Sequence, residues 1–205
     1  MCGFGLQRIL ELLWSSRNER RLRARERLAP RAAPEAFPWI VLVNAALFTL
    51  PLFEAMRRRR PPPIAVSSVG LAGALAAALL RLSVIVTLGE RWTVHAVVPA
   101  SLDVVDHGPY RFVRHPNYVA LTLEFAALPV AGGAYRSAVL LSLLNAAALW
   151  PRIRAEEALL GAIPSYRERM SSKPRFIPRW RDLTVRRVTP ATAEARSARS
   201  PSSRG

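Results

Sequence analysis

Four long apolar segments, separated by clusters of arginine, restrict what this chain can fold into. They cover residues 37–53, 64–88, 118–135 and 138–150; Arg81 interrupts the second and Glu124 the third. A helix over 37–53 would be about 26 Å long, close to the ~30 Å hydrocarbon core of a bilayer. The fourth segment is short, and we expect it to extend back to Tyr135. A soluble bundle would bury such segments too, but four of them, two rich in Ala and Gly, favour membrane helices.

The charge is compatible with a nucleic-acid or a membrane partner. Lys and Arg number 30 against 14 Asp and Glu, a formal net charge of +16. Because apolar segments separate the basic clusters, the pattern favours anionic lipid, and we predict no nucleic-acid partner. The single Cys excludes a disulfide framework, and three widely spaced His predict no metal site.

The distribution of arginine predicts the topology. Placing both termini and the 89–117 loop in the cytoplasm puts most basic residues inside. The run 57–60 then lies outside, against the positive-inside rule. Either the N-terminal charge dominates or one early segment does not span, and both alternatives stay open. The predicted fold is all-α: a polytopic protein of a bacterial inner membrane, with about four transmembrane helices and a cytoplasmic C-terminal helix.

We divide the chain into four parts. Residues 1–35 form a basic amphipathic arm, 36–89 hold the first membrane helices, 90–182 form a core, and 183–205 are a disordered tail. In the arm, apolar side chains recur at helical spacing before a dense run of arginine. This pattern fits a helix in the headgroup region as well as a solvated arm.

Two clusters hold most of the polar side chains that could do chemistry. The first, GPYRFVRHPNY at 108–118, lies where a loop meets an apolar helix, and Pro116 suits the first turn of that helix. Free amides at a helix start favour anions. The second, RIRAEEALL at 152–160, places Arg152 and Glu156 four residues apart on one helix face. Pro151 fits the start of this second helix and Pro164 its end.

The order of these motifs, with Tyr166 and PRFIP after them, resembles the isoprenylcysteine carboxyl methyltransferase (ICMT) family over roughly residues 85–178. Related phospholipid N-methyltransferases share the RHPxY and paired-Glu elements. The flanking LGERWT and LLNAAALWPRIRAEEAL are most similar to a bacterial branch associated with O-methylation of polyketide-derived alkylpyrones and alkylresorcinols. Ala120 departs from the family, which often has Gly there.

The resemblance implies S-adenosylmethionine as the methyl donor, bound at the boundary of membrane and cytoplasm. The sequence has no GxGxxG motif, so a Rossmann-type site is not expected. By similarity, Arg152 faces the acceptor and Glu156 contacts the donor, whose cationic end a carboxylate can hold. The same similarity assigns to the donor pocket Leu102, Asp103, Val104, Val105, Tyr110, His115, Pro116, Asn117 and Tyr118.

Methyl transfer is an in-line displacement that mainly requires alignment and exclusion of water. A carboxylate acceptor needs no base, and Arg152 would orient it. A phenolic or enolic hydroxyl needs one, and His115 or Glu124 could serve. A carboxylate inside an apolar segment is costly, so Glu124 is a candidate catalytic residue or else a buried partner of Arg81 or Arg154.

These patterns lead to three hypotheses. The first is an O-methyltransferase acting on a lipophilic or prenylated acceptor, through an isoprenylcysteine-type carboxylate or a phenolic-lipid hydroxyl. The second is a phospholipid N-methyltransferase. The third is a non-catalytic scaffold whose basic arms bind membrane lipid.

Overall fold

The computed structural model describes residues 2–25, 33–95 and 104–179. Leu102, Asp103 and the predicted disordered tail lie outside these ranges. Within them the chain is helical and contains no strand. The elements are α1 Cys2–Arg25, η1 Pro34–Ala36, α2 Phe37–Met56, α3 Ile64–Leu88, η2 Gly89–Arg91, η3 Gly108–Arg111, α4 Pro116–Ala131, α5 Tyr135–Gly161 and α6 Pro164–Met170.

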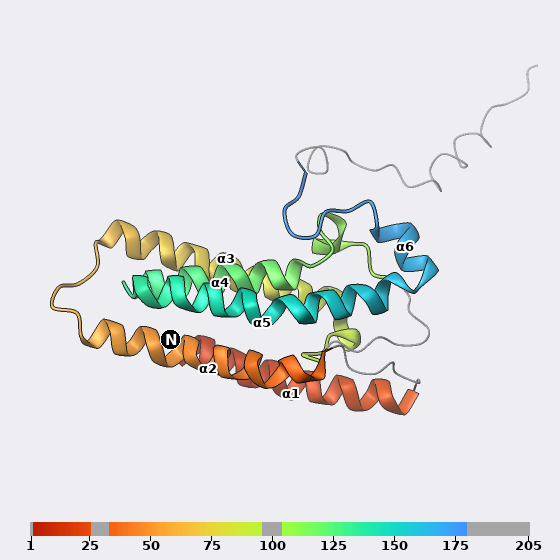
Figure 1. Cartoon of the computed structure of the whole chain (residues 1–205), viewed down its shortest axis with the longest axis horizontal. Helices are drawn as coiled ribbons and strands as arrows, with labels where there is room; N and C mark the ends of the chain where they lie inside the picture. Colours follow the sequence, from red (N-terminus) through yellow and green to blue (C-terminus); the bar gives the residue numbers. More distant parts are fainter. Residues whose placement is uncertain (1, 26–32, 96–103, 180–205) are drawn as a thin grey trace, which may run out of the picture.

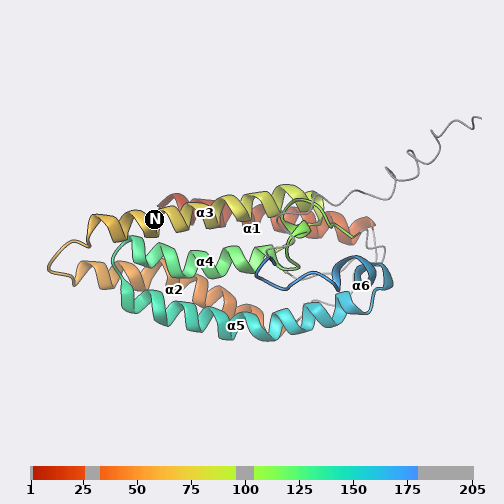
Figure 2. The ribbon, with the colours of Figure 1, turned by 90° about the horizontal axis from the view of Figure 1, so that it is seen from above.

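Helices α2 to α5 run side by side as an up-and-down bundle (Figure 1). The turn between α2 and α3, which carries the arginine run 57–60, lies at one end; α6 and the C-terminal loop lie at the other (Figure 2). A tight turn at Gly132-Gly133 connects α4 to α5. Gly133 has φ +72° and its carbonyl accepts a hydrogen bond from Arg58, while Glu54 accepts from the amides of Arg136 and Ser137 at the start of α5.

Small residues let α3 and α4 approach closely. A Cβ built on Gly70 would lie 2.4 Å from the backbone nitrogen of Ala131, and one on Gly73 would lie 2.9 Å from the Ala127 methyl. Ala74 and Ala77 continue this face and are buried. Close backbone contact through Gly and Ala is typical of helix pairs in membranes.

Each predicted apolar segment forms a helix, but the predicted end of the fourth segment was wrong. The segment 138–150 does not end before the RIRAEEALL cluster: α5 continues from Tyr135 through Pro151 to Gly161. Proline removes only one amide donor from the helix ladder, and buried Leu149 and Ile153 on either side hold the helix together. Arg152 and Glu156 therefore extend directly from a helix of the bundle.

Two helices are long and apolar enough to cross a membrane: Pro34–Met56 and Ile64–Arg91. Helix α4 has 16 residues and contains Glu124, and α5 combines an apolar half with a charged half. The expectation of about four spans is thus supported for two helices and stays a prediction for the others. The outward faces of the bundle do carry exposed apolar side chains, as on α5 at Val139 and Leu143. Such faces suit contact with lipid.

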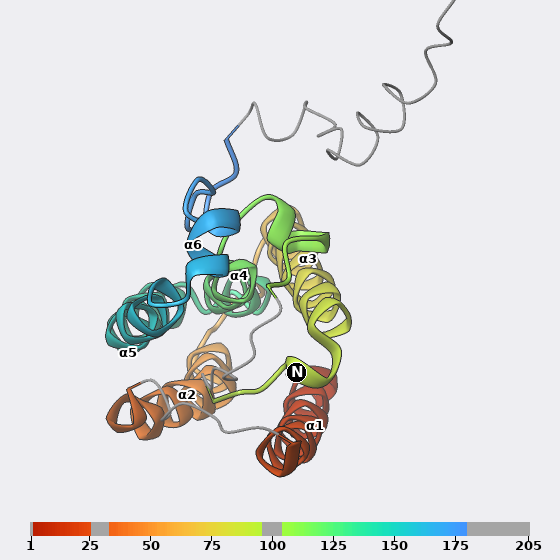
Figure 3. The ribbon, with the colours of Figure 1, turned by 90° about the vertical axis from the view of Figure 1, so that its right-hand side faces the viewer.

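Helix α1 lies beside α3 (Figure 3), and its polar face is the one that is buried. The apolar stripe points away, and Leu13 is 64% exposed, whereas Glu11, Ser15, Asn18 and Glu19 are buried. The segment is therefore neither a free arm nor a helix attached through its apolar stripe. Its buried side chains form specific bonds with α3, α4 and the segment after η2.

Two ion pairs attach α1 to the bundle. Arg8 Nη2 lies 2.5 Å from Glu124 Oε2 of α4, and Arg81 Nε of α3 donates to both carboxylate oxygens of Glu11 at 2.7 and 2.8 Å. The expected partner of Glu124 was therefore wrong: Arg8 takes the place assigned to Arg81 or Arg154. An isolated charge in apolar surroundings is unstable, and pairing compensates for it.

Candidate active site

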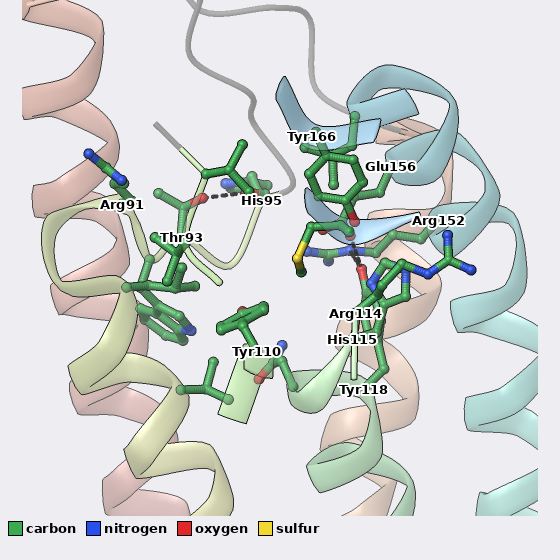
Figure 4. Close-up of a pocket in the computed structure, with 18 residues that line it drawn as sticks. Arg91, Thr93, His95, Tyr110, Arg114, His115, Tyr118, Arg152, Glu156 and Tyr166 are labelled. Atoms are coloured by element: carbon green, nitrogen blue, oxygen red, sulfur yellow. Dashed lines mark hydrogen bonds between the residues drawn. The ribbon is translucent and has the colours of Figure 1, made fainter. Parts of the chain in front are cut away.

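A pocket opens at the α6 end of the bundle (Figure 4). The structure brings together there the two polar clusters of the sequence. The predicted residues that line it are Val104, Val105, Tyr110, His115, Asn117, Tyr118, Arg152 and Glu156. Pro116 begins α4 just beneath but does not line the pocket, and Glu124 lies outside it.

The Tyr118 hydroxyl joins the two helices that carry the predicted donor and acceptor residues. It donates to Glu156 Oε2 at 2.5 Å and accepts from Arg152 Nε at 3.0 Å. Arg152 also donates through Nη2 to the carbonyl of Val94. Three polar groups therefore have fixed orientations at one point of the pocket wall.

His115 is held firmly behind this wall. It is 4% exposed, its Nε2 lies 3.1 Å from Glu157 Oε1, and its amide donates to the carbonyl of Arg175. Glu157 also accepts two bonds from the guanidinium of Arg175, at 2.9 and 2.7 Å. Burial alone would raise the pKa of Glu157, but these bonds from Arg175 and His115 outweigh it and lower that pKa. The Glu157 cluster fixes the C-terminal loop against the start of α4.

Two tyrosines supply aromatic walls. Tyr110 comes from η3 and Tyr166 from α6, where Val104 and Met170 pack with it. Burial, with a smaller effect of the Glu156 charge, raises the pKa of Tyr166 to about 12 and that of Tyr110 further. Both hydroxyls are therefore neutral donors at physiological pH.

The pocket residues fit S-adenosylmethionine. Among the described residues, Tyr166 OH and Arg114 Nε are buried without a hydrogen-bond partner, and both line the pocket. Buried polar atoms without partners are rare in folded proteins, so these two sites are suited to a ligand. Arg114 offers a cation for a carboxylate, Glu156 an anion for a cationic centre, and the tyrosine rings apolar faces for the sulfonium and base.

The sequence did not indicate the role of the segment that follows η2. Trp92, Thr93 and His95 line the pocket, and α1 positions them. Asn18 Nδ2 donates to the carbonyls of Gly89 and Trp92 at 3.1 and 2.8 Å, and the amide of Val94 donates to Ser15 Oγ at 2.7 Å. The only signal was LGERWT, which carried the family resemblance but no assigned contact.

A second cavity lies between α1, α2, α4 and α5. Its wall is mainly apolar, with Phe37, Ile40, Phe48, Leu121 and Leu149 among the lining residues. It shares part of its lining with the first pocket, namely Trp92, Thr93, Asn117, Tyr118 and Arg152. The two cavities therefore meet at Arg152 and Tyr118.

Comparison with known proteins identifies the class. The model of the isoprenylcysteine carboxyl methyltransferase (ICMT) family matches residues 69–162, which include both polar clusters. The match supports the predicted resemblance to the ICMT family. It is also similar to a protein of Bacillus subtilis (strain 168) described as "Uncharacterized protein YpbQ", with 28% identity over 158 residues, 76% of this chain and 90% of that protein. The family match and the two long apolar helices of the described residues support a membrane-bound methyltransferase.

Proposed function

We propose that the chain is an S-adenosylmethionine-dependent O-methyltransferase of a bacterial inner membrane, acting on a lipophilic acceptor. The observation that carries the proposal is the meeting of a polar pocket with an apolar cavity at Arg152 and Tyr118. A methyl donor and a lipid acceptor need such an arrangement, because their reacting atoms must face each other while their remaining parts need different surroundings.

The polar pocket suits the donor. When bound, S-adenosylmethionine supplies an electrophilic methyl group on a sulfonium. Glu156 is positioned to hold a cationic group, and Arg114 and Tyr166 to bind a carboxylate or other polar groups. The loop over α6, attached through Glu157 and Arg175, limits the access of water.

The apolar cavity suits the acceptor chain. The cavity lies between α1 and α2, beside the outward apolar faces of the bundle. The apolar chain of a lipid acceptor would therefore enter it laterally from the bilayer. Arg152 is positioned to orient the polar end of the acceptor, whether a carboxylate or a hydroxyl. In this arrangement the site lies on the cytoplasmic side, and the arginine run 57–60 lies at the opposite surface.

The test is incubation of purified protein in detergent with methyl-labelled donor and separate acceptors: a prenylcysteine, an alkylresorcinol, an alkylpyrone and phosphatidylethanolamine. We expect label on an oxygen of one of the first three. Label only on phosphatidylethanolamine would establish an N-methyltransferase instead, and no donor binding by calorimetry would leave a non-catalytic scaffold.

A further inference from the structure

The two bases nominated from sequence are both engaged elsewhere. His115 uses Nε2 to contact Glu157, and Glu124, which lines neither cavity, is paired with Arg8. If the acceptor carries a hydroxyl, the group that removes its proton must come from another part of the pocket. His95 is the histidine that meets this requirement.

His95 and Glu19 form a carboxylate–imidazole pair. His95 Nδ1 lies 2.8 Å from Glu19 Oε2, and Glu19 is buried at 6% exposure. Arg23 donates to the other carboxylate oxygen at 2.7 and 3.2 Å, which fixes the plane of the carboxylate. On its other side the His95 ring packs against Phe37 with centroids 4.3 Å apart.

This geometry selects one tautomer. In the neutral imidazole the proton lies on Nδ1, where it donates to Glu19, and Nε2 carries the lone pair. No hydrogen bond to Nε2 is recorded among the described residues. His95 lines the polar pocket, and a histidine oriented by a carboxylate activates oxygen nucleophiles in many enzymes.

The segment around His95 lies at the junction of the cavities. The residue before it, Val94, accepts a bond from Arg152, and Thr93 Oγ1 donates to the His95 carbonyl at 2.5 Å. His95 lines the polar pocket, whereas Phe37, on which its ring packs, lines the apolar cavity. An acceptor oxygen oriented by Arg152 is therefore delivered close to the imidazole.

We infer that His95, oriented by Glu19, is the general base that accepts the proton of a phenolic or enolic acceptor hydroxyl. The inference rests on the proposed function and narrows its acceptor: a carboxylate, already ionised, would leave this pair without a role. In the step, Nε2 takes the hydroxyl proton while the acceptor oxygen forms a bond to the methyl carbon. The carbon–sulfur bond breaks, its electron pair stays on sulfur as a neutral thioether, and the proton leaves the imidazolium to solvent.

Charged groups from several elements lie around His95. Glu19 and Arg23 face it from α1, Arg152 approaches its segment from α5, and Arg91 and Arg114 line the same pocket. Phe37 is the neutral contact from α2.

The experiment compares acceptors in His95→Gln and Glu19→Gln, with exposed His107→Gln as the matched control. General base catalysis contributes about 100- to 10,000-fold, so His95→Gln should lower kcat for a weakly acidic hydroxyl acceptor by about 100-fold or more. Donor affinity should stay within about 2-fold. An acceptor already ionised at the assay pH, such as a nitro-substituted alkylphenol or a prenylcysteine carboxylate, should lose little. Glu19→Gln should give a smaller loss of the same kind, and His107→Gln none.

A second readout needs no donor. In histidine-labelled protein, the 15N spectrum has three imidazoles to assign, and His95→Gln identifies one of them. A hydroxyl acceptor should shift the Nε2 resonance of His95, and its O-methyl ether should not. Equal losses with weakly acidic and pre-ionised acceptors, an unchanged rate in His95→Gln, or an unshifted Nε2 resonance would overturn the inference. Absence of donor binding in the wild-type protein would instead overturn the proposed function.

Discussion

The Tyr118 hydroxyl and the Glu156 carboxylate are joined by a hydrogen bond of 2.5 Å between the first turn of α4 and the cytoplasmic half proposed for α5. Arg152 Nε donates to the same hydroxyl oxygen at 3.0 Å. The tyrosine therefore stands between a carboxylate suited to the donor and a guanidinium suited to the acceptor. Variants of these three side chains should separate the two binding events.

Glu156→Gln should weaken donor binding by about 1.5–3 kcal/mol, the usual range for a hydrogen bond to a charged group. Tyr118→Phe should weaken donor binding less, because the carboxylate that attracts the cationic donor remains. Calorimetry in detergent measures both affinities, and Glu168→Gln, an exposed site on α6, is the matched control. Wild-type affinity in Glu156→Gln would remove this carboxylate from the donor site.

Arg152 should act on the acceptor. Arg152→Ala should raise the acceptor KM or lower kcat and leave donor affinity nearly intact. Lysine cannot reproduce the planar pair of hydrogen bonds that arginine makes to a carboxylate. Arg152→Lys should therefore retain little activity with a carboxylate acceptor and more with a phenolate. Steady-state kinetics measure the activity of each variant relative to wild type with each acceptor. The control is Arg154→Lys, because Arg154 is exposed over the Trp150 ring. Donor binding lost as severely as in Glu156→Gln would place Arg152 in the donor pocket.

The sequence predicted local structure and the core motif well, because both depend on neighbours in the chain. Apolar segments predicted α2 and α3, and the resemblance carried by the RHPNY and RIRAEE motifs led to Tyr118, Arg152 and Glu156. Contacts between distant segments were not predictable in this way. Glu124 had several possible arginine partners, and only the docking of α1 selects Arg8.

The packing of α1 was likewise not predictable from the sequence. Its periodicity revealed an apolar and a polar face, but periodicity does not say which face meets protein. In lipid surroundings the apolar face can point outward, so Glu11 and Asn18 are buried and His95 receives its partner Glu19. If the protein were assumed to be soluble, these polar residues would be predicted to face solvent.

The Arg8–Glu124 pair predicts how α1 is held. Arg8→Met should destabilise the protein by about 3–5 kcal/mol, because it leaves Glu124 buried and unpaired, whereas adding Glu124→Met should recover most of the loss. Thermal unfolding in detergent, followed for all four members of the cycle, gives the coupling energy. If Glu124 is only a partner, the double variant keeps methyltransferase activity. Activity lost in the double variant despite recovered stability would assign Glu124 to the chemistry.

Acid should release the C-terminal loop. The pKa of Glu157 is lowered in the folded protein, so its contribution to stability is present above its ordinary value of 4.5 and is lost as the pH falls through the folded value. Unfolding midpoints measured between about pH 6 and about pH 3 should therefore fall less in Glu157→Gln than in wild type. Glu168→Gln, on an exposed carboxylate, should follow the wild-type curve. Parallel curves for Glu157→Gln and wild type would show that the Arg175 contact contributes nothing.

Gly70 should be the most sensitive small residue between α3 and α4. A methyl group there would lie 2.4 Å from the Ala131 nitrogen and 2.7 Å from its Cα, and backbone atoms cannot move aside as a flexible side chain can. Gly70→Ala should therefore push the helices apart and lower stability by about 1–3 kcal/mol, the usual cost of overpacking. Gly161→Ala is the control, since nothing lies within 4 Å of its added methyl, and it should be neutral or slightly stabilising. Thermal unfolding of both variants measures the difference. Because α4 begins at the donor pocket, Gly70→Ala should also weaken donor binding, and an unaffected pocket would show that the strain is absorbed at the Ala131 end of the helix.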